Sequence, residues 1–404
     1  MQIKSSTHTK VIYIAFLSFG IKTIYLVYKY NYAFVENNYA RVSPDEYGYL
    51  IKAMQGFPDM LFGLHWVYEF VNTLALSVFR DVNSTYIGLC LFNILLSLVL
   101  PYLMLPLIRS FSEDNERYNN IFLGSAITLL LMPSAIWLAA SNLKDMLLAI
   151  FNISFVSLFI LLSEEKRKSQ RLMIFISLFV VTFLIFSLRS YLAAILLIAL
   201  GAQLFIESKH KITFLLALLS IVAIIIYFVS LQNSLLFIES RISWVYDPDA
   251  AEIISRQITK MGENPFVVHY TFQDRFLQLG RFVFGPFPTL TADIWENVIL
   301  SIQSGVLLFF LIPLWGSFRY LLSHRNRTFF LTYILLIIVF YSIVGQYSGY
   351  RQRFATLDFF TVLFIVRFYC DETIQMVQSI KIPSILIGCI LNIAFILFTS
   401  RSIL

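Results

Sequence analysis

Residues 172–188 read LMIFISLFVVTFLIFSL, and residues 191–207 read YLAAILLIALGAQLFIE. Only Arg189 and Ser190 separate the two stretches. Each stretch holds 17 residues, and a helix of about 17 to 25 apolar residues is long enough to cross the hydrocarbon core of a bilayer. The sequence therefore predicts two membrane-spanning helices joined by a very short hairpin.

The composition of the whole chain agrees with this local pattern. Hydrophobic residues make up 58% of the 404 residues and charged residues 13%, whereas a soluble domain has roughly 45–50% and 25%. The alternating ten-residue segments of outer-membrane barrels are not found. We expect an all-α, polytopic membrane protein that forms one integral membrane domain over residues 1–404.

About eleven apolar blocks, of 16 to 24 residues, are close to the length that a span needs. The first follows a short basic start with Lys4 and Lys10, which we interpret as a retained signal anchor. The predicted spans are residues 11–28, 85–108, 120–139, 146–163, 172–188, 191–207, 212–232, 294–316, 328–346, 354–369 and 382–400.

A twelfth candidate, residues 60–79, decides the orientation, and it contains His65, Glu69 and Asn72. If it spans, the basic loop 164–171 lies outside. If it stays on the outer surface, every short cytoplasmic loop carries at least one Lys or Arg, as the positive-inside rule requires. We therefore predict a cytoplasmic N-terminus and an external C-terminus.

This topology leaves two sizeable segments outside. Residues 29–84 form the first external segment, in which the amphipathic stretches 46–55 and 60–79 are expected to lie along the membrane surface. Residues 233–293 form one large external loop, rich in aromatic residues.

Several function classes are disfavoured. The formal charge of +6 comes from Lys and Arg between the apolar blocks, where topology explains it, so we expect no nucleic-acid partner. Cys90, Cys370 and Cys389 fall in or beside apolar blocks and indicate packing residues. Residues 247–249, Asp-Pro-Asp, are either a metal-binding pair or a turn, and a turn is favoured. Because no phosphate-binding loop, dinucleotide fingerprint or metalloprotease motif occurs, we expect neither a cofactor nor a metal.

Four cations on the predicted outer side need an explanation of their own. Lys144, Arg189, Arg351 and Arg353 lie in very short outer hairpins, where orientation bias should remove Lys and Arg. An anionic ligand accounts for them, because guanidinium and ammonium groups pair well with phosphate. We therefore predict that these four residues bind substrate.

Each cation also has a structural interpretation. Asn142 and Asp145 have the spacing of a helix capping box, which predicts a capped start to the span 146–163. Arg189 is also suited to an interfacial anchor. Asp358 is placed to neutralise in part the two arginines that precede it.

The acidic candidates are Asp45 and Glu46, which follow the first span. They either start a helix capped by Ser43 or act as the catalytic base. His269 and His65 are also on the predicted outer side, and His269 is a further candidate base.

Lys22 lies in the middle of the first span. A Lys at the centre of a spanning helix costs about 2.5–3.5 kcal/mol unless it faces protein or water. We therefore expect its side chain to point into the bundle.

The layout as a whole resembles that of a known family. An acidic pair follows the first span, a Pro-Ser…Ser-x-Leu-Lys-Asp hairpin runs from Pro133 to Asp145, and Arg351-x-Arg353 precedes a late span. With the large late external loop, this arrangement resembles the bacterial O-antigen and capsular polysaccharide polymerases, within the polyprenyl-phosphate-dependent glycosyltransferases of the GT-C architecture. The resemblance covers the whole chain as layout, and its motifs are short.

The resemblance implies a GT-C-like fold in the bacterial inner membrane and polymerisation of repeat units at the external face. The implied partners are polyprenyl-(di)phosphate-linked saccharides, the lipid bilayer, a chain-length regulator and a flippase. Asp45 and Glu46 match the catalytic acidic pair of this group. The external arginines that match those expected to hold lipid-linked pyrophosphate are Arg189, Arg281, Arg351 and Arg353.

Two alternatives stay open. The Arg-x10-Gly pattern of some O-antigen polymerases is not found in residues 233–293, which favours transfer of a single sugar from a polyprenyl-phosphate sugar. A lipid-linked oligosaccharide flippase should instead place its cations near the midplane and show two similar halves.

Overall fold

The computed structural model describes residues 1–31, 66–208, 282–283, 295–344, 349–371 and 374–401, together with Glu46, Tyr49 and Ala53. Over this part of the chain the structure is helical and contains no strand, which confirms the predicted all-α class. The predicted span 212–232 lies outside the described residues, as does most of the two predicted external segments. The helices are α1 (Ser5–Tyr30), α3 (Trp66–Phe79), α4 (Val82–Leu103), α5 (Leu105–Ser110), α6 (Asn115–Leu131), α7 (Pro133–Ala139), α8 (Asp145–Glu164), α9 (Lys168–Leu188), α10 (Ser190–Glu207), α15 (Trp295–Leu308), α16 (Leu311–Ser323), α17 (Arg327–Val344), α18 (Gly349–Thr356), α19 (Asp358–Asp371) and α20 (Ile374–Arg401).

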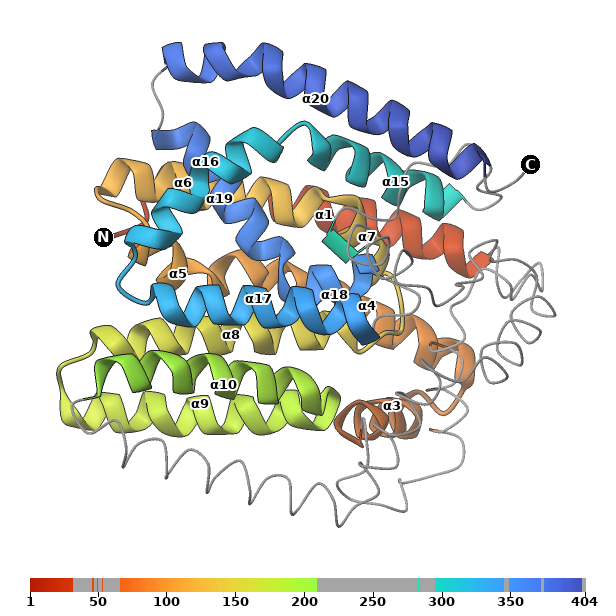
Figure 1. Cartoon of the computed structure of the whole chain (residues 1–404). Coiled ribbons are helices and arrows are strands. Elements are labelled where there is room, and N and C mark those ends of the chain that lie inside the picture. Colours follow the sequence, from red (N-terminus) through yellow and green to blue (C-terminus); the bar gives the residue numbers. More distant parts are fainter. Residues whose placement is uncertain are drawn as a thin grey trace.

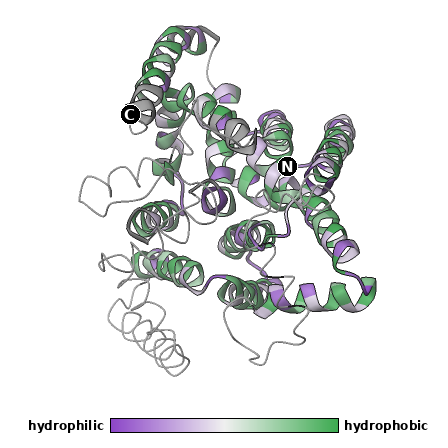
Figure 2. Ribbon diagram, turned by 90° about the vertical axis from the view of Figure 1, so that its right-hand side faces the viewer, coloured by the Kyte–Doolittle hydropathy of each residue, from purple (hydrophilic) through white to green (hydrophobic). Residues whose placement is uncertain are grey.

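Six of the described helical segments are long and apolar enough to cross a membrane, and two bent helix pairs raise the number to eight. Their apolar side chains also cover the outside of the bundle. Phe16 of α1, Phe179 of α9 and Ile390 of α20 are 71%, 69% and 63% exposed, and Figure 2 shows hydrophobic residues on the peripheral helices. Such a surface is stable against lipid and not against water. The fold is therefore compatible with a multi-pass membrane protein.

Two predicted spans are broken rather than continuous. In place of single helices over 120–139 and 294–316, α6 and α7 meet at 57°, and α15 and α16 meet at 66°. Pro133 explains the first break, because it lacks an amide hydrogen and holds Met132 in an extended conformation. Pro313 lies just after the second break and cannot donate to the preceding turn.

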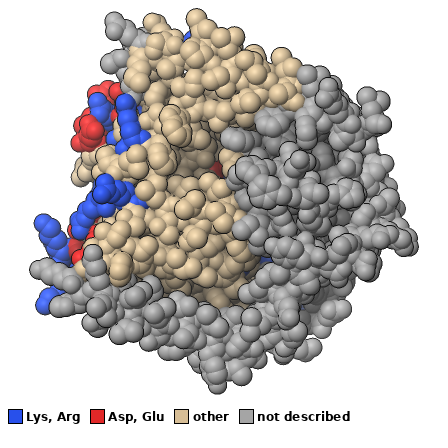
Figure 3. Space-filling view, viewed as in Figure 1, with Lys and Arg blue, Asp and Glu red and all other residues tan. Residues whose placement is uncertain are grey.

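The turns predicted to be cytoplasmic gather at one end of the bundle, which we call the basic end (Figure 1). Arg109 of α5 pairs with Glu164 of α8 at 2.6 Å, and the Lys4 amide donates to Asn119 of α6 at 2.8 Å. Charged side chains gather at the same end of the described surface in Figure 3. The described parts of the predicted outer hairpins, residues 141–145, 189–190 and the start of α18, lie toward the opposite end.

Helix α3 lies across this opposite end. The long helices run lengthwise in Figure 1, whereas α3 is seen almost end-on, and it packs against α4 and α9. It forms the second part of the stretch 60–79. It therefore runs crosswise to the long helices.

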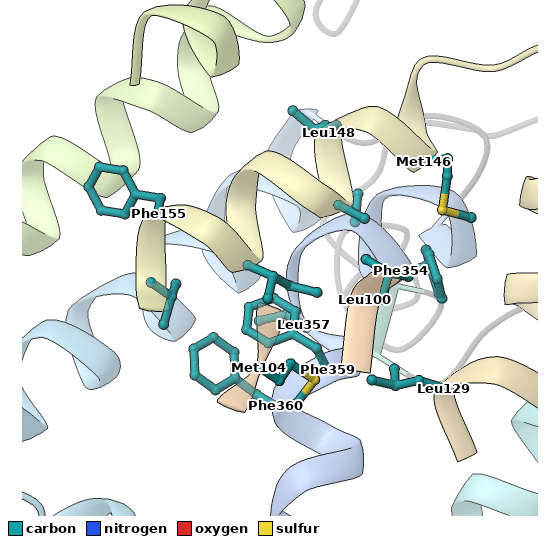
Figure 4. Packing of buried hydrophobic residues seen from close by; sticks show 14 of the residues in the cluster. Leu100, Met104, Leu129, Met146, Leu148, Phe155, Phe354, Leu357, Phe359 and Phe360 are labelled. Atoms are coloured by element: carbon teal, nitrogen blue, oxygen red, sulfur yellow. The ribbon is translucent and has the colours of Figure 1, made fainter. Parts of the chain in front are cut away.

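A dense apolar core fixes α18 and α19 against the rest of the bundle. In Figure 4, Met104, which links α4 and α5, lies among Leu357, Phe359 and Phe360, and all four side chains are buried. The rings of Phe359 and Phe360 are 4.3 Å apart between centroids. This packing sets the position of α18, which carries two of the predicted site residues.

The predicted direction of Lys22 is confirmed. Its side chain in α1 is fully buried, and its Nζ donates to Ser97 Oγ of α4 at 2.8 Å. The amine therefore faces protein, as its cost in lipid requires.

Candidate functional site

The connection between α7 and α8 is the centre of the candidate site. Its residues, Ser141–Asp145, are all buried, with exposed fractions between 0% and 5%. We call this segment the 141–145 hairpin. Because a buried loop must satisfy its polar groups internally, its partners define the site.

Glu46 holds the backbone of the hairpin. Its fully buried carboxylate pairs with Lys29 Nζ of α1 at 2.8 Å. Its other oxygen accepts hydrogen bonds from the Tyr86 hydroxyl and the Asn142 amide, each at 2.8 Å. Lys29 also donates to Ser141 Oγ at 2.7 Å. Both oxygens of Glu46 are thus occupied, and the charge of the carboxylate is compensated by Lys29.

The side chain of Asn142 ties α3 to the hairpin. Its Nδ2 donates to Asn72 Oδ1 at 2.9 Å, and the Tyr68 hydroxyl donates to its Oδ1 at 2.7 Å. From α4, Asn93 donates to the Ser141 carbonyl at 2.8 Å. The crosswise helix α3 is therefore fixed by polar contacts as well as by packing.

The capping-box interpretation of Asn142 and Asp145 is wrong. Helix α8 starts without a side-chain cap, because Asn142 is engaged by α3 and Asp145 by two arginines. Contacts with distant parts of the chain thus take the place of the predicted local cap.

Asp145 lies between two arginines that are distant in the sequence. Arg189 Nη2 reaches one carboxylate oxygen at 2.7 Å. Arg351 reaches the other with Nη2 at 2.7 Å and with Nε at 3.1 Å. Lys144 directly precedes Asp145 in the chain, and its Nζ lies 5.8 Å from the centre of the Tyr49 ring. We call Lys144, Asp145, Arg189 and Arg351 the Asp145 cluster.

Among its four residues the cluster has three cations and one carboxylate. Two unit charges about 6 Å apart at an effective dielectric of about 20 repel by about 3 kcal/mol. The shared carboxylate offsets that repulsion. The excess charge makes this a place where an anion is stabilised.

Arg353 points elsewhere. Residues two apart on a helix lie on different faces, so within α18 only Arg351 reaches Asp145. Arg353 pairs with Asp358 at 2.9 Å and donates to the Val283 carbonyl at 3.0 Å. The predicted neutralisation by Asp358 is confirmed for Arg353, whereas Arg351 pairs with Asp145.

An aromatic group adjoins Arg189, and the sequence analysis missed it. The Tyr191 hydroxyl accepts a hydrogen bond from Arg189 and lies 3.0 Å from the Tyr341 hydroxyl. The ring of Phe282 stacks on Tyr341 with centroids 4.7 Å apart. The position of Tyr191, two residues after Arg189, was the available signal.

Two guanidinium nitrogens are buried without a hydrogen-bond partner, Arg189 Nε and Arg353 Nη2. Leaving a buried donor unsatisfied costs about 1–3 kcal/mol. A ligand oxygen at either position would remove that cost.

The structure thus brings Glu46, Lys144, Arg189 and Arg351 to one hairpin and places Arg353 on the far face of α18. The other predicted site residues, Asp45, His269 and Arg281, lie outside the described residues. Phe282, which follows Arg281, packs against the aromatic group beside Arg189.

The donor set of the site suits an anion. Among the described residues no group of three or more His, Cys, Asp or Glu side chains is placed to hold a metal ion. The three cysteines are free thiols. Guanidinium and ammonium groups are hydrogen-bond donors only, and their ligands are oxyanions.

When the chain is compared with protein-family models, curated proteins and solved structures, nothing matches. The functional assignment therefore rests on the site itself.

Proposed function

We propose that the chain is a glycosyltransferase of the bacterial inner membrane that uses a polyprenyl-diphosphate-linked saccharide donor. Its most specific form is a polymerase of O-antigen or capsule repeat units at the external face. The observation that carries the proposal is the Asp145 cluster, in which two arginines share one carboxylate beside Lys144 at the end opposite the basic loops. The proposal includes eleven spans, a cytoplasmic N-terminus and an external C-terminus.

The chemistry of a lipid diphosphate fits such a cluster. The lipid anchors the donor at the membrane surface, and the diphosphate is the leaving group. When the bond between the anomeric carbon and the diphosphate oxygen breaks, negative charge grows on that oxygen. Arg189 and Arg351 can hold it with paired N–H groups, and Lys144 adds a third positive charge.

The acceptor needs a base. The attacking hydroxyl of the acceptor sugar loses its proton as its oxygen bonds to the anomeric carbon. We propose Asp45 or His269 as the base that accepts this proton. Glu46, buried and paired with Lys29, fits the role of positioning the hairpin.

A second candidate function, transport of the lipid-linked saccharide, has one observation in its favour. Broken spans are typical of transporters, and the broken pairs α6–α7 and α15–α16 touch, with the Ser134 amide donating to Gln303 at 2.7 Å. The Asp145 cluster lies at one end of the bundle, which favours the transferase. Transfer of a single sugar shares this site chemistry and is the alternative among enzymes.

Deletion of the gene separates these functions by the lipopolysaccharide or capsule ladder on a gel. Caps with one repeat unit support the polymerase. A missing side branch supports single-sugar transfer, and loss of the whole chain supports transport. The ladder should return with the wild-type gene and with an Arg109→Ala control from the basic end, but not with Arg189→Ala combined with Arg351→Ala.

A further inference from the structure

Asp145 is the one residue of its cluster that repels a phosphate ligand, yet it lies at the centre. It is fully buried at the start of α8. Each of its oxygens serves a different arginine, Arg189 after α9 and Arg351 in α18. If the cluster served only to attract anions, this carboxylate would weaken it.

We infer that Asp145 is a positioning residue, which holds Arg189 and Arg351 side by side so that the pair receives two adjacent phosphoryl groups. The inference rests on the proposed function and deepens it, because it selects a diphosphate over a monophosphate ligand. Asp145 itself does not touch the substrate.

The donor geometry of Arg189 supports this role. Its Nη2 is held by Asp145 and its Nη1 by the Tyr191 hydroxyl. Its Nε is buried and has no hydrogen-bond partner. A guanidinium that the protein holds at two nitrogens is preorganised, so little conformational entropy is lost when the ligand binds.

Charge alone does not distinguish the two ligand classes. Counted over its own four residues, the cluster has three cations and one carboxylate, and a phosphate monoester at neutral pH carries about −1.5 to −2. Selection must come from the spacing of the two guanidiniums, which receive one phosphoryl group each. The carboxylate that both arginines share sets that spacing.

Positioning and neutralisation predict opposite effects for Asp145→Asn. This variant keeps the shape of the side chain and raises the net charge of the cluster by one. If Asp145 only neutralises charge, every anion binds more tightly. If it positions the arginines, the preference for a diphosphate falls.

The test measures dissociation constants of the purified full chain for farnesyl diphosphate and farnesyl monophosphate, two ligands with the same tail. We expect Asp145→Asn to reduce the preference for the diphosphate about tenfold, as loss of one charge-assisted hydrogen bond would. The matched control is Asp358→Asn, which removes a buried carboxylate that pairs with a single arginine. It should change the preference by less than about twofold, as a separate site does.

A preference that is unchanged in Asp145→Asn, or tighter binding of both ligands to the same extent, overturns the inference. If that variant does not fold, Asp145→Glu keeps the charge and moves it by one methylene, and it too should lower the preference. Binding needs no glycosyl transfer. An Asp145-dependent preference in a chain whose deletion leaves the ladder intact would therefore refute the proposed function alone, and the reverse result would refute only this inference.

Discussion

The two ends of the helix bundle both carry arginines, and they use them differently. At the basic end, Arg109 pairs with Glu164 while the side chains remain 45% and 35% exposed. At the opposite end, the Arg189, Arg351 and Arg353 side chains are 13%, 9% and 3% exposed. Exposed ion pairs contribute about 0–1 kcal/mol to stability, whereas removing one partner of a buried pair costs about 3–5 kcal/mol.

This difference separates two reasons for keeping a charge in a membrane protein. Exposed charges such as those of Arg109 and Glu164 need only to stay in water, which is enough to orient a chain. Arg189, Arg351 and Arg353 are held by carboxylates on other elements. Only the second arrangement fixes the direction of a guanidinium, and a binding site needs that direction.

The largest expected effect is on cysteine labelling, which shows which end of the bundle faces the outside and is either present or absent. Asn83 at the start of α4 and Ser169 at the start of α9 are both exposed, at opposite ends of the bundle. Single cysteines at these positions should label oppositely, Asn83→Cys from outside and Ser169→Cys only after permeabilisation. If both cysteines were labelled from the same side, the eleven-span topology would be wrong, and so would the external position of the site.

The next effect concerns stability. Asp145→Ala leaves two buried guanidiniums without their shared carboxylate and should destabilise the protein by about 3–5 kcal/mol. Its matched control, Glu164→Ala, removes an exposed partner and should cost less than about 1 kcal/mol. Thermal unfolding in detergent compares the two, and equal losses would contradict the distinction between the ends.

Substitution of Arg by Lys tests the two arginines of α18. Arg351→Lys keeps the charge and loses the planar fork, so chain extension should fall about tenfold or more. Arg353→Lys, on the other face of the helix, should have the smaller effect. Ladders on a gel, corrected for protein level, give the comparison, and wild-type ladders from both variants would leave these arginines a structural role.

A smaller effect is expected with pH at the basic end. His324, between α16 and α17, stacks on Phe111 with centroids 4.3 Å apart, and burial lowers the pKa of His324 to about 4 from 6.5. The folded state thus binds a proton less readily than the unfolded state. Stability is complete above about pH 6.5 and falls as the pH drops towards 4.

Between pH 7 and 5 this loss should reach about 1–2 kcal/mol after allowance for partial exposure. His324→Phe should reduce it, measured as the difference in unfolding temperature between the two pH values. An identical pH dependence in the variant would show that other groups are responsible.

The smallest effect is expected for the exposed pair itself. Arg109→Gln should change stability by less than about 1 kcal/mol, and 1 M salt should abolish the difference, because exposed charges are screened. Unfolding at low and high salt measures it. A large, salt-independent loss would mean that the pair is not the surface contact its exposure indicates.

Much of the fold and part of the candidate site could be predicted from the sequence. Apolar blocks located the long described helices, and the orientation bias identified Lys144, Arg189 and Arg351 as unusual before any contact was known. Pro133 also indicated a break in the helix, but the long apolar stretch 120–139 was predicted as one continuous span.

What the sequence did not show is which charges meet. Asp145 lies 44 residues from Arg189 and 206 from Arg351, and no local pattern encodes such a pairing. Local rules assigned Asp145 to a helix cap, and the tertiary partners prevailed because two guanidiniums bind a buried carboxylate more strongly than backbone amides do.

The shared carboxylate also imposes an order on assembly. Asp145 and Arg189 belong to consecutive helices, so they can meet as soon as α8, α9 and α10 have been inserted. Arg351 is synthesised much later. Until it arrives, Asp145 has one guanidinium partner, Arg189, and the neighbouring Lys144. The second guanidinium is added only when α18 docks, so the pair of arginines is complete only at a late stage of synthesis.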